Sequence, residues 1–181
     1  MMDIELIRRL FLYYARFVTK DVRKKIAKQI TTSRSHGYDE LLAEALALPE
    51  DLALPEINDF VFSINEKYVA DAIKNNKNTV LFVEYGQVTV MQTPLIKTDI
   101  GLAVTIGSEF SIANRDMIEE VLMMQRNLEL LTKIIDTMVK DQREQTECGV
   151  EYITFPAEIL PVEPQLFYDH GGWVAMFKRA E

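Results

Sequence analysis

The sequence contains very little cysteine, glycine or proline. Cys148 is the one cysteine among 181 residues, so an internal disulfide is excluded. Seven glycines and six prolines are too few for a long flexible linker. The longest apolar runs, such as Leu10 to Ala15, fall far short of the roughly 20 residues that span a bilayer. These absences predict a soluble protein of a reducing cytoplasm, with no membrane span and no export signal.

Sequence motifs for catalysis and cofactor binding are missing as well. Neither of the glycine-rich phosphate-binding patterns, Gly-x-x-x-x-Gly-Lys or Gly-x-Gly-x-x-Gly, occurs in the chain. The Gly-x-Ser-x-Gly turn that presents a nucleophilic serine is absent too. Cys148 follows Glu147, an acidic setting that does not favour a reactive thiolate. We therefore expect no enzyme, no catalytic residues, no cofactor and no metal.

One local pattern leaves an alternative open. His170 is one of two histidines and lies in Tyr168-Asp169-His170-Gly171-Gly172. An acid beside an imidazole on a glycine turn is compatible with an acid–base or metal site, although zinc requires three or four ligands. Turn formation explains the same residues equally well. A small enzyme or ligand-binding domain with a site near Asp169 and His170 is therefore the alternative function.

The size and charge of the chain indicate one acidic globular domain with a basic N-terminal segment. Its 48% hydrophobic and 27% charged residues are ordinary globular composition. Residues 1–34 carry nine Lys and Arg against three Asp and Glu, and the rest carry 11 against 25. Such a segment is expected to lie against its own acidic body or a neighbouring subunit. An adaptor that binds nucleic acid or an acidic partner through the basic helix is the alternative, and the acidic remainder opposes nucleic acid.

Residues 3–30 show the apolar periodicity of one helix. The apolar side chains cover about half of the circumference, which is wider than a single packing neighbour needs. The helix is therefore either wedged into its own core or partly in contact with another chain. We take its cationic stripe and two aromatic residues as the candidate interface: Arg9, Phe11, Arg16, Phe17, Lys20 and Arg23.

A second, short helix is predicted for residues 38–48, with its apolar side on Leu41, Leu42, Ala45 and Leu46. Pro49 ends it, and Pro55 keeps the next segment extended. We therefore divide the chain into an N-terminal helical appendage, residues 1–57, which is not an independent domain, and an α+β core domain, residues 58–181.

The core domain begins with a predicted helix from the capping box Ser63 to Glu66 up to about Asn76, with Ile64, Tyr68, Ala72 and Ile73 directed inward. Two strands at 79–91 and 98–106 form a predicted hairpin, and the second alternates Ile100, Leu102, Val104 and Ile106 on one face. Strands at 152–160 and 165–178 follow later, the last interrupted by a turn at 169–172.

Between the two pairs of strands lies the strongest helical signal of the chain. Asn114 is the predicted cap of a helix over residues 115–140. Its predicted core face consists of Ile118, Val121, Leu122, Gln125, Leu128, Leu131, Ile135 and Met138. The predicted fold class is α+β, with an antiparallel or mixed sheet of about five strands packed by this long helix.

The order of these predicted elements resembles that of a known class of proteins. An apolar hairpin, Val80 to Gly86 and Leu102 to Ile106, leads into the long helix, which passes through Leu130 to Asp136, and the chain closes with Gly172 to Phe177. Residues 79–181 thereby resemble small prophage-encoded structural proteins of the tail-terminator or neck class. Members of that class are α+β proteins that assemble as rings and have no enzymatic activity.

The resemblance implies a structural protein that forms a homo-oligomer and contacts other assembly proteins. It assigns no functional residue. It implies that the virion, as well as the cytoplasm, is an expected location of the protein. No membrane partner is expected.

Overall fold

The computed structural model of the chain describes residues 5–27, 35–64, 66–74, 78–85, 101–110, 116–145, 153–162 and 169–179. Five helices and five strands follow one another in these residues. In chain order they are α1 (Leu6–Ala15), α2 (Lys20–Ile26), α3 (Tyr38–Ala47), β1 (Asp59–Phe62), α4 (Glu66–Lys74), β2 (Thr79–Tyr85), β3 (Leu102–Glu109), α5 (Met117–Glu144), β4 (Ile153–Val162) and β5 (His170–Arg179).

The five strands form one mixed sheet in the order β1-β2-β3-β5-β4. β1 and β2 are parallel, and every other neighbouring pair is antiparallel. The predicted α+β class, with a mixed sheet and one long packing helix, is confirmed. β1 was not predicted, because its four residues are too short for an alternating pattern and Phe60 and Val61 are both buried.

Both faces of the central strands are covered. Leu81 pairs with Ile106 and Val83 with Val104, and all four belong to the main core. The predicted inward positions Leu102, Val104 and Ile106 are buried, while Ile100 lies outside the described residues. On the other face, Val80, Phe82 and Val61 pack against Ile73 of α4.

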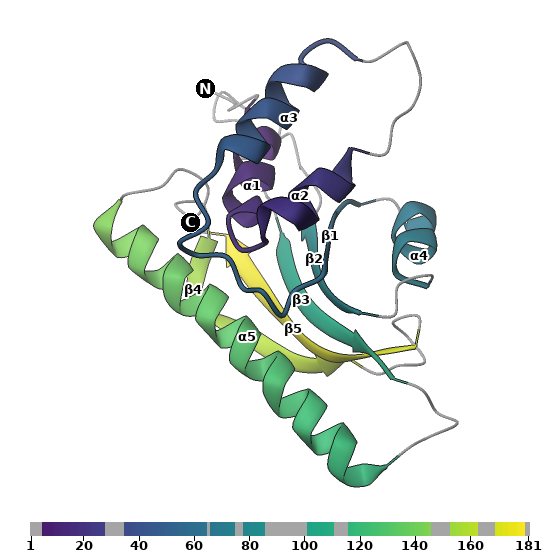
Figure 1. Cartoon of the computed structure of the whole chain (residues 1–181). Helices are drawn as coiled ribbons and strands as arrows, with labels where there is room; N and C mark the ends of the chain where they lie inside the picture. Colours follow the sequence, from purple (N-terminus) through teal and green to yellow (C-terminus); the bar gives the residue numbers. More distant parts are fainter. Residues whose placement is uncertain are drawn as a thin grey trace.

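The N-terminal helices are part of the main core. Leu6, Leu10, Tyr14 and Val18 are buried in the same cluster as β2, β3, β5 and α5. In Figure 1, α1 and α2 lie at one end of the sheet and α5 runs across it toward the opposite end. The division at residue 57 stays a prediction, but the helical segment before it supplies core side chains and does not stand apart from the sheet.

The single helix predicted for residues 3–30 is wrong, because the chain turns between α1 and α2. The backbone N–H groups of Arg16, Phe17 and Val18 each donate to the carbonyl three residues earlier, which forms tight turns. Thr19 then caps α2 by accepting a hydrogen bond from the backbone N–H of Val22. The carbonyl of Phe17 accepts from the backbone N–H of Leu54. This turn lets the wide apolar stripe wrap around the core, which explains why so many of its side chains are buried.

The inward face predicted for α5 is wrong in its first half. Leu131 and Met138 are fully buried as predicted, and Leu128 and Ile135 are half-buried. Gln125 is exposed, and the remaining predicted core residues are among the most exposed apolar side chains in the described chain: Ile118, Val121 and Leu122. Asp116 caps the helix by accepting from the N–H of Ile118, and Asn114 lies outside the described residues.

Two smaller predictions also need correction. Ile64, predicted to point inward, precedes α4 and is exposed, whereas Ile73 is buried as predicted, and the side chain of Tyr68 lies outside the described residues. Of the predicted turn at 169–172, Asp169 alone is a turn residue, with φ 62°, and the other three belong to β5. Gly172 is needed for close approach, because a Cβ there would lie 1.9 Å from the carbonyl oxygen of Ile106.

None of the described helices combines the length and the apolarity that crossing a membrane requires.

Candidate functional site

Two of the six candidate interface residues, Arg16 and Phe17, are buried in their own chain, and Arg16 also joins the end of α1 to α5. The guanidinium of Arg16 lies 2.6 Å from the carboxylate of Asp141, which also accepts a hydrogen bond from the Tyr13 hydroxyl at 2.8 Å. Both partners of the ion pair are nearly buried, and the Arg16 guanidinium stacks 4.4 Å from the centre of the Tyr13 ring. Phe17 is 1% exposed and packs against Tyr13 and Tyr14. Burial in their own chain makes Arg16 and Phe17 unavailable to another protein.

Arg23 is buried as well and binds the end of α3. Its guanidinium donates to the carbonyls of Ala45 at 2.8 Å and Leu48 at 2.7 Å, and Glu50 lies 4.0 Å away. The carbonyls at a helix end carry partial negative charge, so a cation is favourable there. Burial lowers the pKa of the guanidinium below its usual value, and Glu50 opposes that change. Arg23 is therefore a buried positive charge in the junction of the first three helices.

The other three candidate interface residues keep some access to solvent. Lys20 is exposed at the start of α2, and Arg9 is half-buried on α1. Phe11 is half-buried and stacks on Phe60 of β1, with the ring centres 5.9 Å apart. Among described residues 5–27, the exposed cations therefore lie on α2, at Lys20, Lys24 and Lys25, together with the exposed Asp21.

The largest exposed apolar cluster in the described chain lies on α5. Met117, Ile118, Val121 and Leu122 are 78%, 70%, 60% and 51% exposed. Their spacing places them in adjoining positions over the first two turns of one helix. We call these four residues the α5 patch. Single exposed apolar residues are ordinary on protein surfaces, whereas a contiguous group of this size is typical of a surface that binds another molecule.

The α5 patch is exposed because it lies on the side of the helix that is turned away from the core, and the helix is also longer than the layer it covers. At 1.5 Å per residue, the 28 residues of α5 extend over about 42 Å. The inward side is held by Asn127, which donates to the carbonyl of Gly171 and accepts from Ser108, and by the indole of Trp173, which donates to the carbonyl of Met124. In Figure 1 the first turns of α5 extend past the ends of the strands, at the bottom of the picture.

Three carboxylates lie in the same turns of α5 as the patch. Asp116 and Glu119 are exposed, and Glu120 is half-buried. Acidic side chains in the first helical turn are stabilised by the positive end of the helix dipole, so their positions are explained by local structure. Glu119 and Glu120 flank the apolar side chains, and Arg126 is exposed one turn beyond Leu122.

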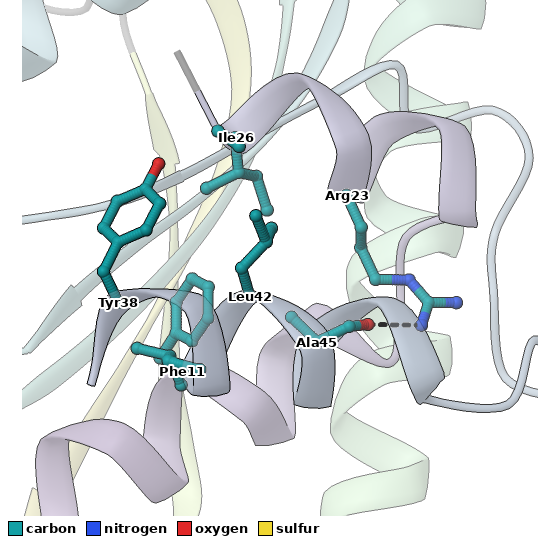
Figure 2. A pocket seen from close by; sticks show the side chains of 8 residues that line it. Phe11, Arg23, Ile26, Tyr38, Leu42 and Ala45 are labelled. Carbon is teal, nitrogen blue, oxygen red and sulfur yellow. Dashed lines mark hydrogen bonds between the residues drawn. The ribbon is translucent and has the colours of Figure 1, made fainter. Parts of the chain in front are cut away.

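A second feature lies at the other end of the molecule, where α1, α2 and α3 meet. A cavity of about 110 Å³ opens between them, and its walls are almost entirely apolar. We call it the helical cavity. Figure 2 shows side chains from all three helices converging on it. Its apolar lining includes Phe11, Ile26, Tyr38, Leu41, Leu42 and Ala45. Arg23 forms part of the wall and reaches across to the carbonyl of Ala45.

Of the two residues of the alternative site, one is exposed and the other is buried. Asp169 is exposed in the turn, and its carbonyl accepts from the backbone N–H of Phe110 at 2.7 Å. His170 is 1% exposed and paired with Glu109 in the sheet. Cys148 lies outside the described residues. Within the described ranges no three His, Cys, Asp or Glu side chains gather closely enough to hold a metal, and the expectation of no metal stays a prediction.

Comparison of the chain with protein-family models, with curated proteins and with solved structures found no match.

The α5 patch was present in the sequence pattern but assigned to the wrong side of the helix. Sixteen residues separate Ile118 from the fully buried Ile134, and at 3.6 residues per turn this places them about 160° apart around the axis. The two sets of apolar residues therefore mark opposite sides, and a helical wheel drawn over the whole element would have separated them. The helical cavity has no comparable signal, because it arises where three helices meet.

Proposed function

We propose that this chain is a non-enzymatic assembly protein whose copies associate through the α5 patch. The observation that carries the proposal is the exposure of four large apolar side chains at one end of a helix whose other end is buried in the core. Removing apolar surface from water favours association, by about 25 cal/mol for each Å² that becomes buried. A surface of this composition is stabilised when another protein covers it.

Two buried polar residues of α5, Asp141 and Asn127, have structural partners, which supports a non-enzymatic function. Asp141 is neutralised by Arg16 and accepts from Tyr13, and Asn127 connects α5 to β3 and β5. These contacts join elements that are far apart in the sequence. Their hydrogen bonds account for the burial of these groups without a substrate.

The resemblance to tail-terminator and neck proteins indicates which kind of assembly protein we propose. The proposed protein is a structural component of that kind, which acts as a homo-oligomer together with other assembly proteins, in the cytoplasm or in the particle. Gene neighbourhood is an independent check, since such a component is expected among genes for capsid and tail proteins.

The test is the native mass of the intact chain and of Val121→Asp, measured by light scattering at concentrations from about 1 µM to about 1 mM, which spans tight to weak complexes. Val121 is mostly exposed, so the substitution is expected to change the free energy of unfolding by no more than about 0.5 kcal/mol. Lys133→Asp, on the exposed polar side of the same helix, is the matched control.

On this proposal the intact chain and the control associate, and Val121→Asp remains monomeric. A folded, intact chain that is monomeric over the whole concentration range contradicts the proposal. An oligomer of unchanged mass in Val121→Asp also contradicts it, because the association would then use another surface.

A further inference from the structure

The wall of the helical cavity contains a buried hydrogen-bond donor that lacks a partner. Arg23 is fully buried and lines the cavity together with apolar side chains. Two of its guanidinium nitrogens donate to carbonyls at the end of α3, whereas its Nε has no hydrogen-bond partner among the residues that the structure describes. An unpaired buried donor is costly, and native structures contain few of them. An acceptor is therefore missing at this wall.

We propose that the helical cavity binds a small neutral molecule with a largely apolar body and one hydrogen-bond acceptor, such as a carbonyl oxygen, that pairs with Nε of Arg23. Side chains of α1, α2 and α3 all contribute to this site (Figure 2). The site shares no residue with the α5 patch, so the inference does not depend on the association of copies.

The volume of the cavity limits the size of the ligand. An apolar cavity of about 150 Å³ is large enough to hold benzene. The helical cavity measures about 110 Å³, which suits a five-membered ring or a short branched chain. Apolar side chains such as Phe11, Ile26 and Leu42 then shield the body of the ligand from water.

An apolar molecule with one acceptor suits this wall better than water does. A buried water molecule needs roughly two to four polar partners, and the walls are almost entirely apolar. The Tyr38 hydroxyl is the other polar group among the lining side chains, and Figure 2 shows Tyr38 and Arg23 on opposite sides of the lining. A water molecule at Nε would therefore lose most of the hydrogen bonds that it makes in bulk solvent.

The charge of Arg23 is already compensated, which favours a neutral ligand. Its guanidinium contacts the carbonyls at the end of α3, and the carboxylate of Glu50 is 4.0 Å away. The helices around the cavity carry exposed charges of both signs, because Lys20 and Asp21 lie on α2 and Asp39 lies on α3. These charges do not favour an anion, and burying a carboxylate among apolar side chains is costly.

The test compares two probes of similar shape by NMR of methyl groups. Cyclopentanone carries a carbonyl oxygen where methylenecyclopentane carries a CH₂ group. Both probes are expected to shift the methyl signals of Ile26, Leu42 and Ala45 in a saturable way and to leave those of the buried Ile134 unchanged. Cyclopentanone is expected to bind about tenfold more tightly, because it accepts from Nε. Without that hydrogen bond, the cost of removing its carbonyl from water reverses the order.

Substitutions locate the binding site and the donor. Ala45→Leu places a larger side chain in the cavity, and Ala43→Leu makes the same change at an exposed position of the same helix. Binding of cyclopentanone is expected to be lost in the first variant and unchanged in the second. Leu42→Phe takes the place of Ala45→Leu if that variant does not fold. Arg23→Lys removes the Nε donor of the guanidinium, so the tenfold preference for cyclopentanone is expected to disappear.

A preference for cyclopentanone that is lost in the filled cavity and in Arg23→Lys supports the inference. If neither probe causes saturable shifts at the cavity methyl groups, the inference is overturned, because the cavity is then closed or filled by the chain itself. Tighter binding of methylenecyclopentane in the intact chain overturns the pairing with Arg23. Tighter binding of isobutyrate, a small branched carboxylate, than of cyclopentanone overturns the neutral ligand. Equal binding in the intact chain and in Ala45→Leu places the probe elsewhere and overturns the site.

Discussion

The two halves of α5 follow different rules, although they belong to one continuous helix. Its second half buries Ile134 and Met138 together with the charged Asp141, whereas its first turns expose Ile118 and Leu122. If apolarity alone decided burial, Leu122 would be buried and Asp141 would be exposed. The neighbours that the fold supplies decide the difference, because Arg16 at the end of α1 covers Asp141, whereas Leu122 lies on the outward side of the first turns, which extend past the strands.

The largest effect is expected at the ion pair that joins α1 to the buried half of α5. Asp141→Ala leaves the nearly buried Arg16 without its counter-charge, and removing one partner of a buried pair costs about 3–5 kcal/mol. Denaturant unfolding measures the change. Asp136→Ala, at an exposed acid of the same helix, is expected to change stability by no more than about 0.5 kcal/mol.

A double variant sharpens that prediction. Replacing the pair with apolar residues, as in Arg16→Met with Asp141→Leu, is expected to recover much of the lost stability, because no uncompensated charge then remains. Equal costs for Asp141→Ala and Asp136→Ala would show that the pair does not hold α1 in place.

Alanine substitutions at two leucines compare the two halves of α5 directly. Leu131→Ala removes a fully buried side chain, and such truncations cost about 2–5 kcal/mol. Leu122→Ala removes a side chain that is half exposed to solvent, so a change of at most about 1 kcal/mol is expected. Thermal or denaturant midpoints of the two variants, measured at a concentration where the protein is monomeric, provide the comparison. Similar losses at both positions would contradict the assigned faces.

The smallest effect expected is a dependence of the free energy of unfolding on pH. Burial raises the pKa of the Tyr14 phenol, whose hydroxyl contacts the sulfur of Met138, whereas the pKa of an unfolded tyrosine is about 10. Stability is therefore fully present below that pH and falls above it, because the unfolded chain releases the proton and the folded chain keeps it. One such group contributes a slope of about 1.4 kcal/mol per pH unit.

Tyr14→Phe is expected to remove that share of the slope while changing stability at neutral pH only slightly. Unfolding free energies measured at several pH values above about 10 give both slopes. Identical slopes in the intact chain and the variant would be inconsistent with a buried, neutral Tyr14.

Much of the fold could be predicted because it is encoded locally. Leu102, Val104 and Ile106 alternate, and the alternation places them on the buried face of β3 as expected. α3 and α5 were found from their helical periodicity. β1 was missed because a four-residue strand next to β2 is defined by its parallel pairing, which no local pattern records. The turn between α1 and α2 left one local sign, Thr19 followed by Asp21, that is typical of a helix start.

The candidate site was less predictable because its features depend on distant contacts. Arg16 and Arg23 were taken as exposed cations, but their partners are Asp141 and the carbonyls of α3, and a helical pattern does not show those contacts. The burial of Asn127 depends in the same way on Ser108 and Gly171. Periodicity identified α5 as amphipathic, but choosing its inward side required these polar partners.

The most direct test of the central claim compares two methionines at opposite ends of α5. Met117 in the patch is largely exposed and Met138 is fully buried, so the oxidation rates of their thioethers report the two halves separately. If copies associate through the α5 patch, the rate at Met117 falls as the protein concentration rises, while Met138 stays protected throughout. A rate at Met117 that does not change with concentration, in samples whose mass shows association, would contradict the account.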